Sequence, residues 1–186
     1  MAAMTTSETA SATAAPTAPD RAAPSTVAGE REMLEGWLAF HRQTLALKCA
    51  GLNEEQLRER AVPPSDLTLL GLVRHMAEVE HSWFRNRLSD EKAPSLYCTG
   101  ADPDGDLHPG EDATWNEAYA TWQAEIAHAR EVAAPLPLDH RGTGERSRTG
   151  EPFNLRWIYT HMIEEYARHN GHADLLRERL DGTTGD

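Results

Sequence analysis

Residues 155–182, LRWIYTHMIEEYARHNGHADLLRERLDG, decide the fold of this chain. Apolar residues recur along this stretch at three- and four-residue steps, which places them on one face of an α-helix. They are Leu155, Met162, Tyr166, Ala173, Leu176 and Leu180. Asn154 is a suitable N-cap, and Gly182 is a common residue just past a helix end. The stretch therefore predicts one amphipathic helix of about seven turns.

Three earlier segments carry the same helical periodicity. They run from Glu30 to about Ala50, from Ser65 or Asp66 to about Leu88, and from about Asp112 to Ala134. The connector 139–150 contains three glycines, and we expect it to be an irregular crossing without a strand. Four amphipathic helices joined by connectors of unequal length predict an all-α fold, a four-helix bundle.

The first 28 residues differ in composition from the rest, with 10 Ala, 9 Ser or Thr and 3 Pro. A segment of this kind buries too little apolar surface to offset the loss of chain entropy. It also lacks the basic flank and continuous apolar block of a signal peptide. We therefore expect a disordered tail over residues 1–28 and a single bundle domain over residues 29–186.

The formal net charge of −12 over 186 residues argues against two classes of partner. Nucleic acids and anionic membranes both attract basic surfaces, so we expect neither as a partner. No stretch approaches the roughly 18 consecutive apolar residues of a membrane-spanning helix. Cys49 and Cys98 are too few for a disulfide scaffold and do not form a C-x-x-C pair. Reduced thiols and a cytoplasmic location are the simplest interpretation.

Two histidines and one glutamate form the candidate metal site. His169 falls in the middle of the apolar stripe of the last helix, and Glu165 lies one turn earlier, so their side chains can converge at the edge of the core. His75 lies at the border of the buried face of the second helix. Two nitrogens and one carboxylate oxygen leave coordination positions open, as in catalytic metal sites. The alternative for any single inward histidine is a hydrogen-bonded core residue.

Other histidines lie near the same helix faces. We interpret His41 as a core or pocket residue, whereas His81 is rotated away from the buried face and is expected to be solvated. His161 and His172 lie at the edge of the last helix. They support the metal ligands from outside, replace one of them as a ligand, or are solvated, and the pattern favours the last of these.

Four arginines make one part of this acidic chain locally basic. They are Arg141, Arg146, Arg148 and Arg156. Guanidinium groups suit a carboxylate-bearing ligand, although a solvated loop is the simpler alternative. The Gly142-Thr143-Gly144 sequence lacks the rest of a dinucleotide-binding fingerprint.

Two stretches resemble the DinB-like superfamily, specifically its DUF664 branch. They are LTLLGLVRHM at residues 67–76 and RWIYTHMIEEYARHNGHAD at residues 156–174. The resemblance covers nearly everything after the tail and implies a DinB/YfiT-like bundle. It also implies a divalent metal, commonly zinc or nickel, held by His75, Glu165 and His169. Many members have His where Glu165 stands, but thiol-dependent maleylpyruvate isomerase relatives have Glu there.

The resemblance further implies a low-molecular-weight thiol cofactor. An Ala- and Arg-rich sequence with few Lys fits the actinobacterial members, which use mycothiol. The leading hypothesis is therefore a metal-dependent thiol transferase or isomerase that acts on an electrophilic substrate. In this hypothesis Arg141 and Arg156 bind the thiol. The alternatives are a non-catalytic metal-binding or stress-related bundle and a metal-dependent hydrolase, and the family's dimers make a homodimer an option.

Overall fold

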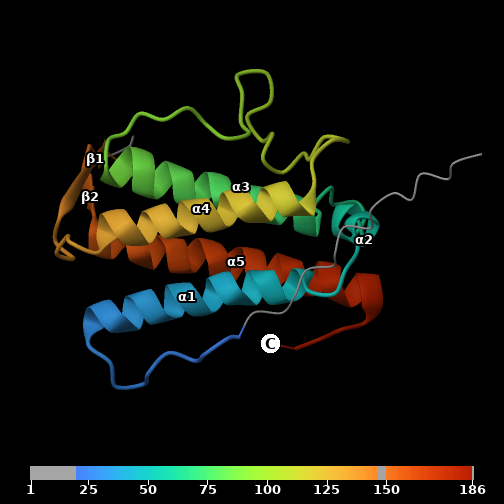
Figure 1. The fold of residues 1–186 in the computed structure, drawn as a ribbon, viewed down its shortest axis with the longest axis horizontal. Helices are drawn as coiled ribbons and strands as arrows, with labels where there is room; N and C mark the ends of the chain where they lie inside the picture. Colours follow the sequence, from blue (N-terminus) through green and yellow to red (C-terminus); the bar gives the residue numbers. More distant parts are fainter. Residues whose placement is uncertain (1–19, 146–149, 186) are drawn as a thin grey trace, which may run out of the picture.

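The computed structural model describes residues 20–145 and 150–185 (Figure 1). Residues 1–19 of the predicted tail lie outside these ranges, as do Arg146 and Arg148. The elements, in chain order, are α1 (Glu30–Cys49), α2 (Glu54–Arg58), α3 (Leu69–Glu80), the π-helix η1 (His81–Leu88), α4 (Trp115–Ala133), β1 (Arg141–Glu145), β2 (Pro152–Asn154) and α5 (Leu155–Asp181).

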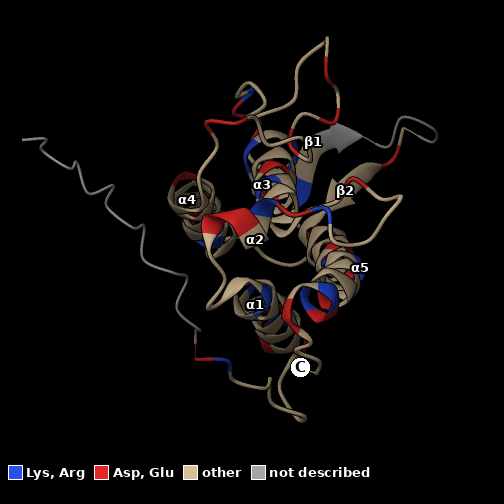
Figure 2. Ribbon diagram, turned by 90° about the vertical axis from the view of Figure 1, so that its right-hand side faces the viewer, with Lys and Arg blue, Asp and Glu red and all other residues tan. Residues whose placement is uncertain are grey.

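The long helices form a bundle, as the periodicity predicts. α1 packs mainly on α5, and α3 packs mainly on α4. Seen end-on in Figure 2, these four helices occupy four corners, and the short α2 lies across one end. The prediction of an all-α helical bundle is confirmed. None of the helices in the described ranges is long and apolar enough to cross a membrane.

Local sequence signals place the helix ends. The Asn154 side-chain oxygen accepts a hydrogen bond from the Trp157 backbone N–H at 2.8 Å, which caps α5 as predicted. Gly182, with φ of 79°, ends the same helix in the left-handed conformation. The N-cap of α3 is Thr68, whose hydroxyl accepts from the Gly71 N–H at 2.9 Å. Residues 65–67 therefore precede this helix.

The prediction that the connector 139–150 contains no strand is wrong. β1 and β2 form an antiparallel pair in which Arg141 lies opposite Asn154. A Cβ atom on Gly142 would lie only 2.2 Å from the Arg87 carbonyl oxygen, so glycine allows β1 to pack closely against η1. Glycines weaken the strand signal in the sequence because they are rare in strands for conformational reasons. α2 was also not predicted, since five residues show too little periodicity.

A buried polar network connects all four long helices. Glu80 of α3 is completely buried and accepts two hydrogen bonds from Arg42 of α1, at 2.7 and 2.6 Å. It also accepts one from the Tyr166 hydroxyl of α5 at 2.7 Å, and the Trp122 indole of α4 donates to that hydroxyl at 2.7 Å. Burial raises the pKa of Tyr166, so its hydroxyl remains a donor. The network compensates the cost of burying Glu80 and fixes the order of the helices.

Residues 89–114 cross over α3 (Figure 1), and two side chains of that helix hold them there. Arg74 donates to the carbonyl oxygens of Gly105 and Asp106 at 3.0 and 3.3 Å. Glu78 accepts from the Tyr97 N–H at 2.9 Å. The crossing segment therefore has a defined position beside the candidate metal ligand of α3.

The described part of the predicted tail contacts α1. Arg21 donates to the Thr44 hydroxyl at 3.0 Å, and its guanidinium lies 4.4 Å from the centre of the Phe40 ring. The domain boundary at residue 29 stays a prediction.

Candidate metal centre

His75, Glu165 and His169 lie together between α3 and α5. One potential ligand atom from each of the three side chains lies within 4.8 Å of the other two. The rings of His75 and His169 are 4.5 Å apart, and Glu165 Oε2 is 3.5 Å from His169 Nε2. The three side chains are largely shielded from solvent, with 20%, 17% and 11% exposure for His75, Glu165 and His169. Two imidazoles and a carboxylate are a donor set that suits zinc and nickel.

Asp106 fixes the orientation of His75. Its Oδ2 atom lies 2.7 Å from His75 Nδ1, and its side chain is 8% exposed. Burial by itself raises the pKa of this carboxyl, but the hydrogen bond and charge of His75 outweigh burial and hold the pKa below its ordinary value. With Nδ1 engaged by Asp106, Nε2 is the His75 nitrogen that remains for a metal. A carboxylate behind a histidine in this way is typical of metal ligands.

His169 has a comparable partner on its own helix. His172 Nδ1 lies 3.4 Å from His169 Nδ1, which leaves His169 Nε2 facing Glu165. Burial and the neighbouring His75 and His172 lower the pKa of His169 to about 4. At neutral pH this ring is therefore uncharged, which is the form in which imidazole binds a metal.

Glu165 lies between two histidines. Its Oε2 faces His169, while its Oε1 is 3.4 Å from His161 Nε2. The His161 ring stacks on Trp157 at 4.9 Å and meets Trp83 edge-on at 4.6 Å, so it is held in place by aromatic contacts. Burial lowers the pKa of His161. His161 and His172 are thus half-buried neighbours of the candidate ligands, and the expectation that they are solvated is wrong.

Two further histidines, His41 and His81, are not part of this cluster. His41 is half-buried and meets the Asn170 side-chain amide at 3.3 Å, in agreement with a core or pocket residue. His81 is 4% exposed, so the prediction that it is solvated is wrong. α3 and η1 are covered by α4 as well as α5, and His81 Nδ1 lies 3.4 Å from Glu125 of α4. The prediction for His81 failed because it assumed that the helix formed by α3 and η1 has a single buried face.

The two candidate thiol-binding arginines occupy different environments. Arg156, in the first turn of α5, pairs with Glu30 at 2.6 Å and with Asp139. It precedes Glu165 by nine residues, or about 14 Å along the helix axis. Arg141 borders an open cavity of about 350 Å³ together with Trp157, whose ring stacks on His161. Arg141 therefore lines a cavity whose Trp157 wall stacks on the neighbour of Glu165, whereas Arg156 is engaged in ion pairs.

Asp106 is the functional candidate that the sequence did not reveal. It lies 31 residues from His75 in a segment without periodicity, so spacing gives no sign that the two side chains meet. The only local signal is a run of three acidic residues in that segment, Asp102, Asp104 and Asp106.

Comparison with known proteins assigns the chain to a family. No curated protein sequence matches the chain at a significant level. A family model described as mycothiol-S-transferase matches residues 33–182, from the first turn of α1 to the residue after α5. The match includes all three candidate ligands and is of the DinB-like type that the two sequence stretches resemble. The chain therefore belongs to the mycothiol-S-transferase family.

Proposed function

We propose that this protein transfers mycothiol to an electrophilic acceptor at a divalent metal held by His75, Glu165 and His169. The observation that supports this proposal is the convergence of these three side chains in a member of a mycothiol-S-transferase family. The three donors leave coordination positions for a thiol. Zinc is the first candidate for the metal and nickel the second.

A bound divalent metal would supply Lewis acidity that lowers the pKa of a thiol and makes its sulfur nucleophilic at neutral pH. The protein's own residues prepare the site for that chemistry. Asp106 orients His75, His172 contacts the outer nitrogen of His169, and burial keeps His169 uncharged. Glu165 contributes a negative charge, which compensates part of the charge of a divalent cation.

We assign the polar body of the thiol to the cavity beside Arg141. Its lining includes Arg141, Glu151 and Asn154, which offer charged and amide groups to a polar ligand, and Trp157, which offers a ring face. Trp157 precedes Glu165 by eight residues, or about 12 Å along α5. A thiol of moderate length would thus span from this cavity to the metal. Arg156 supports the same end of the bundle through Asp139 and Glu30.

Metal analysis of the purified full-length protein tests the site. We expect near-stoichiometric zinc or nickel in the unsubstituted protein and in His108→Ala, whose side chain is 53% exposed and lies outside the candidate site. We expect loss of that metal in His169→Ala. Equal metal content in all three proteins, or none even after incubation with zinc and nickel, would overturn the assignment.

Activity measurements with the same three proteins test the reaction. The metal-loaded protein and His108→Ala should catalyse the addition of mycothiol to an electrophile, and His169→Ala should not. Retained metal without transfer to any acceptor would favour the non-catalytic metal-binding bundle. Hydrolysis of an ester or amide without thiol would favour the hydrolase.

A further inference from the structure

One further cavity lies beside the candidate metal centre. It has a volume of about 220 Å³ and is lined by Val62, Ser65, Leu67, His172, Leu175 and Leu176. Four of these six residues are aliphatic, and no acidic or permanently charged side chain contributes to the lining. Water in such a cavity finds few hydrogen-bond partners, so an apolar ligand would displace it at little cost.

His172 connects this cavity to the metal centre. The residue lines the cavity, and its Nδ1 atom lies 3.4 Å from His169 Nδ1. His172 and Leu176 follow His169 by three and seven residues, so all three lie on one face of α5. A group in the cavity would therefore lie next to the candidate ligand.

Leu175 forms an exposed part of the wall. Leu175 is 56% exposed, and Val27 and Trp37 are the other large apolar residues that are exposed among the described ones. An exposed leucine alone is ordinary, but this one stands beside a cavity that is otherwise built from core-packing residues such as Leu67 and Leu176. A ligand that filled the cavity would cover it.

The cavity beside Arg141 has the opposite character. It lies toward the N-terminus of α5 and includes charged and amide side chains, whereas the aliphatic cavity lies toward the C-terminus. The candidate ligands Glu165 and His169 stand between them along the helix. The two substrates of a transferase would thus enter environments of different polarity on either side of the reacting centre.

We propose that the cavity formed by Val62, Leu67, Leu175 and Leu176 binds an uncharged apolar substituent of the electrophilic acceptor. The proposal rests on the function proposed above and adds the class of acceptor, a small electrophile with an alkyl or aryl group. Leu175 is then a specificity-determining residue. It contacts the acceptor but takes no part in the reaction.

A homologous series of terminal epoxides, from 1,2-epoxybutane to 1,2-epoxyoctane, tests the proposal with metal-loaded full-length protein and mycothiol. In this reaction the sulfur bonds to the terminal carbon, the C–O bond to that carbon opens, and the oxygen takes up the proton released by the thiol. We expect kcat/KM to rise about two- to fourfold per added methylene until the cavity is filled. Leu175→Asn should flatten this dependence, and Val27→Asn, at an exposed site in the described part of the tail, should leave it unchanged.

Binding of 1-hexanol, an unreactive apolar probe, gives a readout independent of turnover. Methyl NMR signals of Val62, Leu67 and Leu175 should shift on its addition to the unsubstituted protein, and those of Val62 and Leu67 should shift much less in Leu175→Asn. If the methyl signals shift but mycothiol is transferred to none of the epoxides, the proposed function is overturned and the cavity remains an apolar binding site. If mycothiol is transferred but kcat/KM does not depend on chain length and the methyl signals do not shift, the cavity proposal alone is overturned.

A second copy of the chain is the competing occupant of this surface. Sedimentation velocity distinguishes it, because a dimer that dissociates in Leu175→Asn while chain-length dependence is unchanged would identify a subunit interface. That result would also overturn the acceptor proposal. An unchanged oligomeric state together with a flattened epoxide series would support it.

Discussion

Asp106 Oδ2 lies 2.7 Å from His75 Nδ1, which joins a loop carboxylate to a candidate ligand on α3. Asp106 is in turn held by Arg74, which binds the carbonyl oxygens of Gly105 and Asp106. The orientation of one ligand therefore depends on how the 89–114 segment is fastened to α3. A metal centre built in this way gains precision from residues that never touch the metal.

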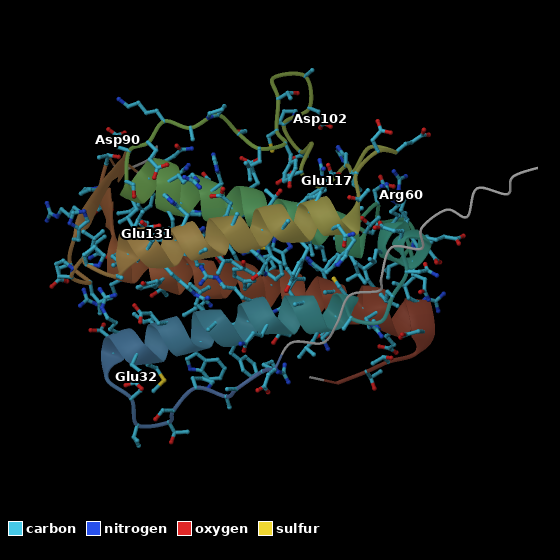
Figure 3. All side chains as sticks on the ribbon, viewed as in Figure 1. Glu32, Arg60, Asp90, Asp102, Glu117 and Glu131 are labelled. Atoms are coloured by element: carbon cyan, nitrogen blue, oxygen red, sulfur yellow. The ribbon has the colours of Figure 1, made fainter. Side chains whose placement is uncertain are left out.

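Asp106→Ala should lower metal affinity about 10- to 100-fold, because His75 loses the partner that fixes its ring and tautomer. Competition with a chromophoric chelator measures the affinity. Asp102→Ala is the matched control, since Asp102 lies in the same segment (Figure 3) and pairs with the exposed His108. Equal affinities of the two variants would show that Asp106 does not orient a ligand.

Glu80→Ala should destabilise the fold by about 3–5 kcal/mol, because Arg42 would be left as a buried charge without its partner. Urea denaturation measures this change. Asp66→Ala, which removes an exposed ion pair with Arg60 at 2.9 Å, should cost at most about 1 kcal/mol. The double variant Arg42→Met/Glu80→Leu should be more stable than Glu80→Ala. A similar cost for Glu80→Ala and Asp66→Ala would contradict this role of the network.

The helix faces that carry the candidate metal ligands could be predicted from the sequence. His169 and Glu165 lie one turn apart on the most regular helix, and a period of 3.6 residues places them correctly at the edge of the core. His75 was found in the same way on a facing helix. The three residues meet because α3 and α5 are neighbours in the bundle. Periodicity thus suffices for residues that lie in or beside the main apolar stripe of their helix.

Other features depend on contacts that periodicity does not describe. His81 looks solvent-facing in the pattern but is buried, because α3 and η1 contact α4, α5 and the 89–114 segment. Asp106 lies in an irregular segment whose position depends on Arg74. β1 is not predicted because it contains glycines, and its close approach to η1 requires one of them, Gly142. In each case a tertiary contact, and no local propensity, decides the outcome.

The stability of the metal-free protein should fall as the pH decreases from 7.5 to 5. Burial lowers the folded-state pKa of His169 to about 4, below its ordinary value of 6.5. As the pH falls, His169 therefore takes up a proton in the unfolded chain before it does so in the folded protein. Its contribution to the free energy of unfolding is fully present above pH 6.5 and is lost as the pH falls toward 4. His169 alone accounts for a loss of about 2 kcal/mol between pH 7.5 and 5.

Urea denaturation of the metal-free protein at both pH values measures this loss. His169→Gln should reduce it, whereas His108→Gln, at an exposed site, should leave it unchanged. His41 and His161, whose pKa values burial also lowers, should account for part of the remaining slope. An identical pH dependence for His169→Gln and the unsubstituted protein would rule out a buried, uncharged His169.

The two cysteines should react very differently with Ellman's reagent at pH 8. Cys49 is completely buried, and burial raises its pKa to about 12, so its thiol should react only when the protein unfolds. Cys98 is partly exposed, although burial also raises its pKa, and it should react in the folded state at less than the rate of a free thiol. One equivalent should therefore react without denaturant and a second in guanidinium chloride.

Modification of Cys98 should also weaken metal binding, because the thiol and the Asp106 carboxylate perturb each other's pKa and are therefore close neighbours. A bulky adduct at that position would displace Asp106 from His75 and lower metal affinity in the direction expected for Asp106→Ala. Cys98→Ser should abolish the fast reaction with the reagent and protect metal affinity from it. If the modified protein binds metal with unchanged affinity, the Asp106–His75 contact does not depend on the Cys98 side chain.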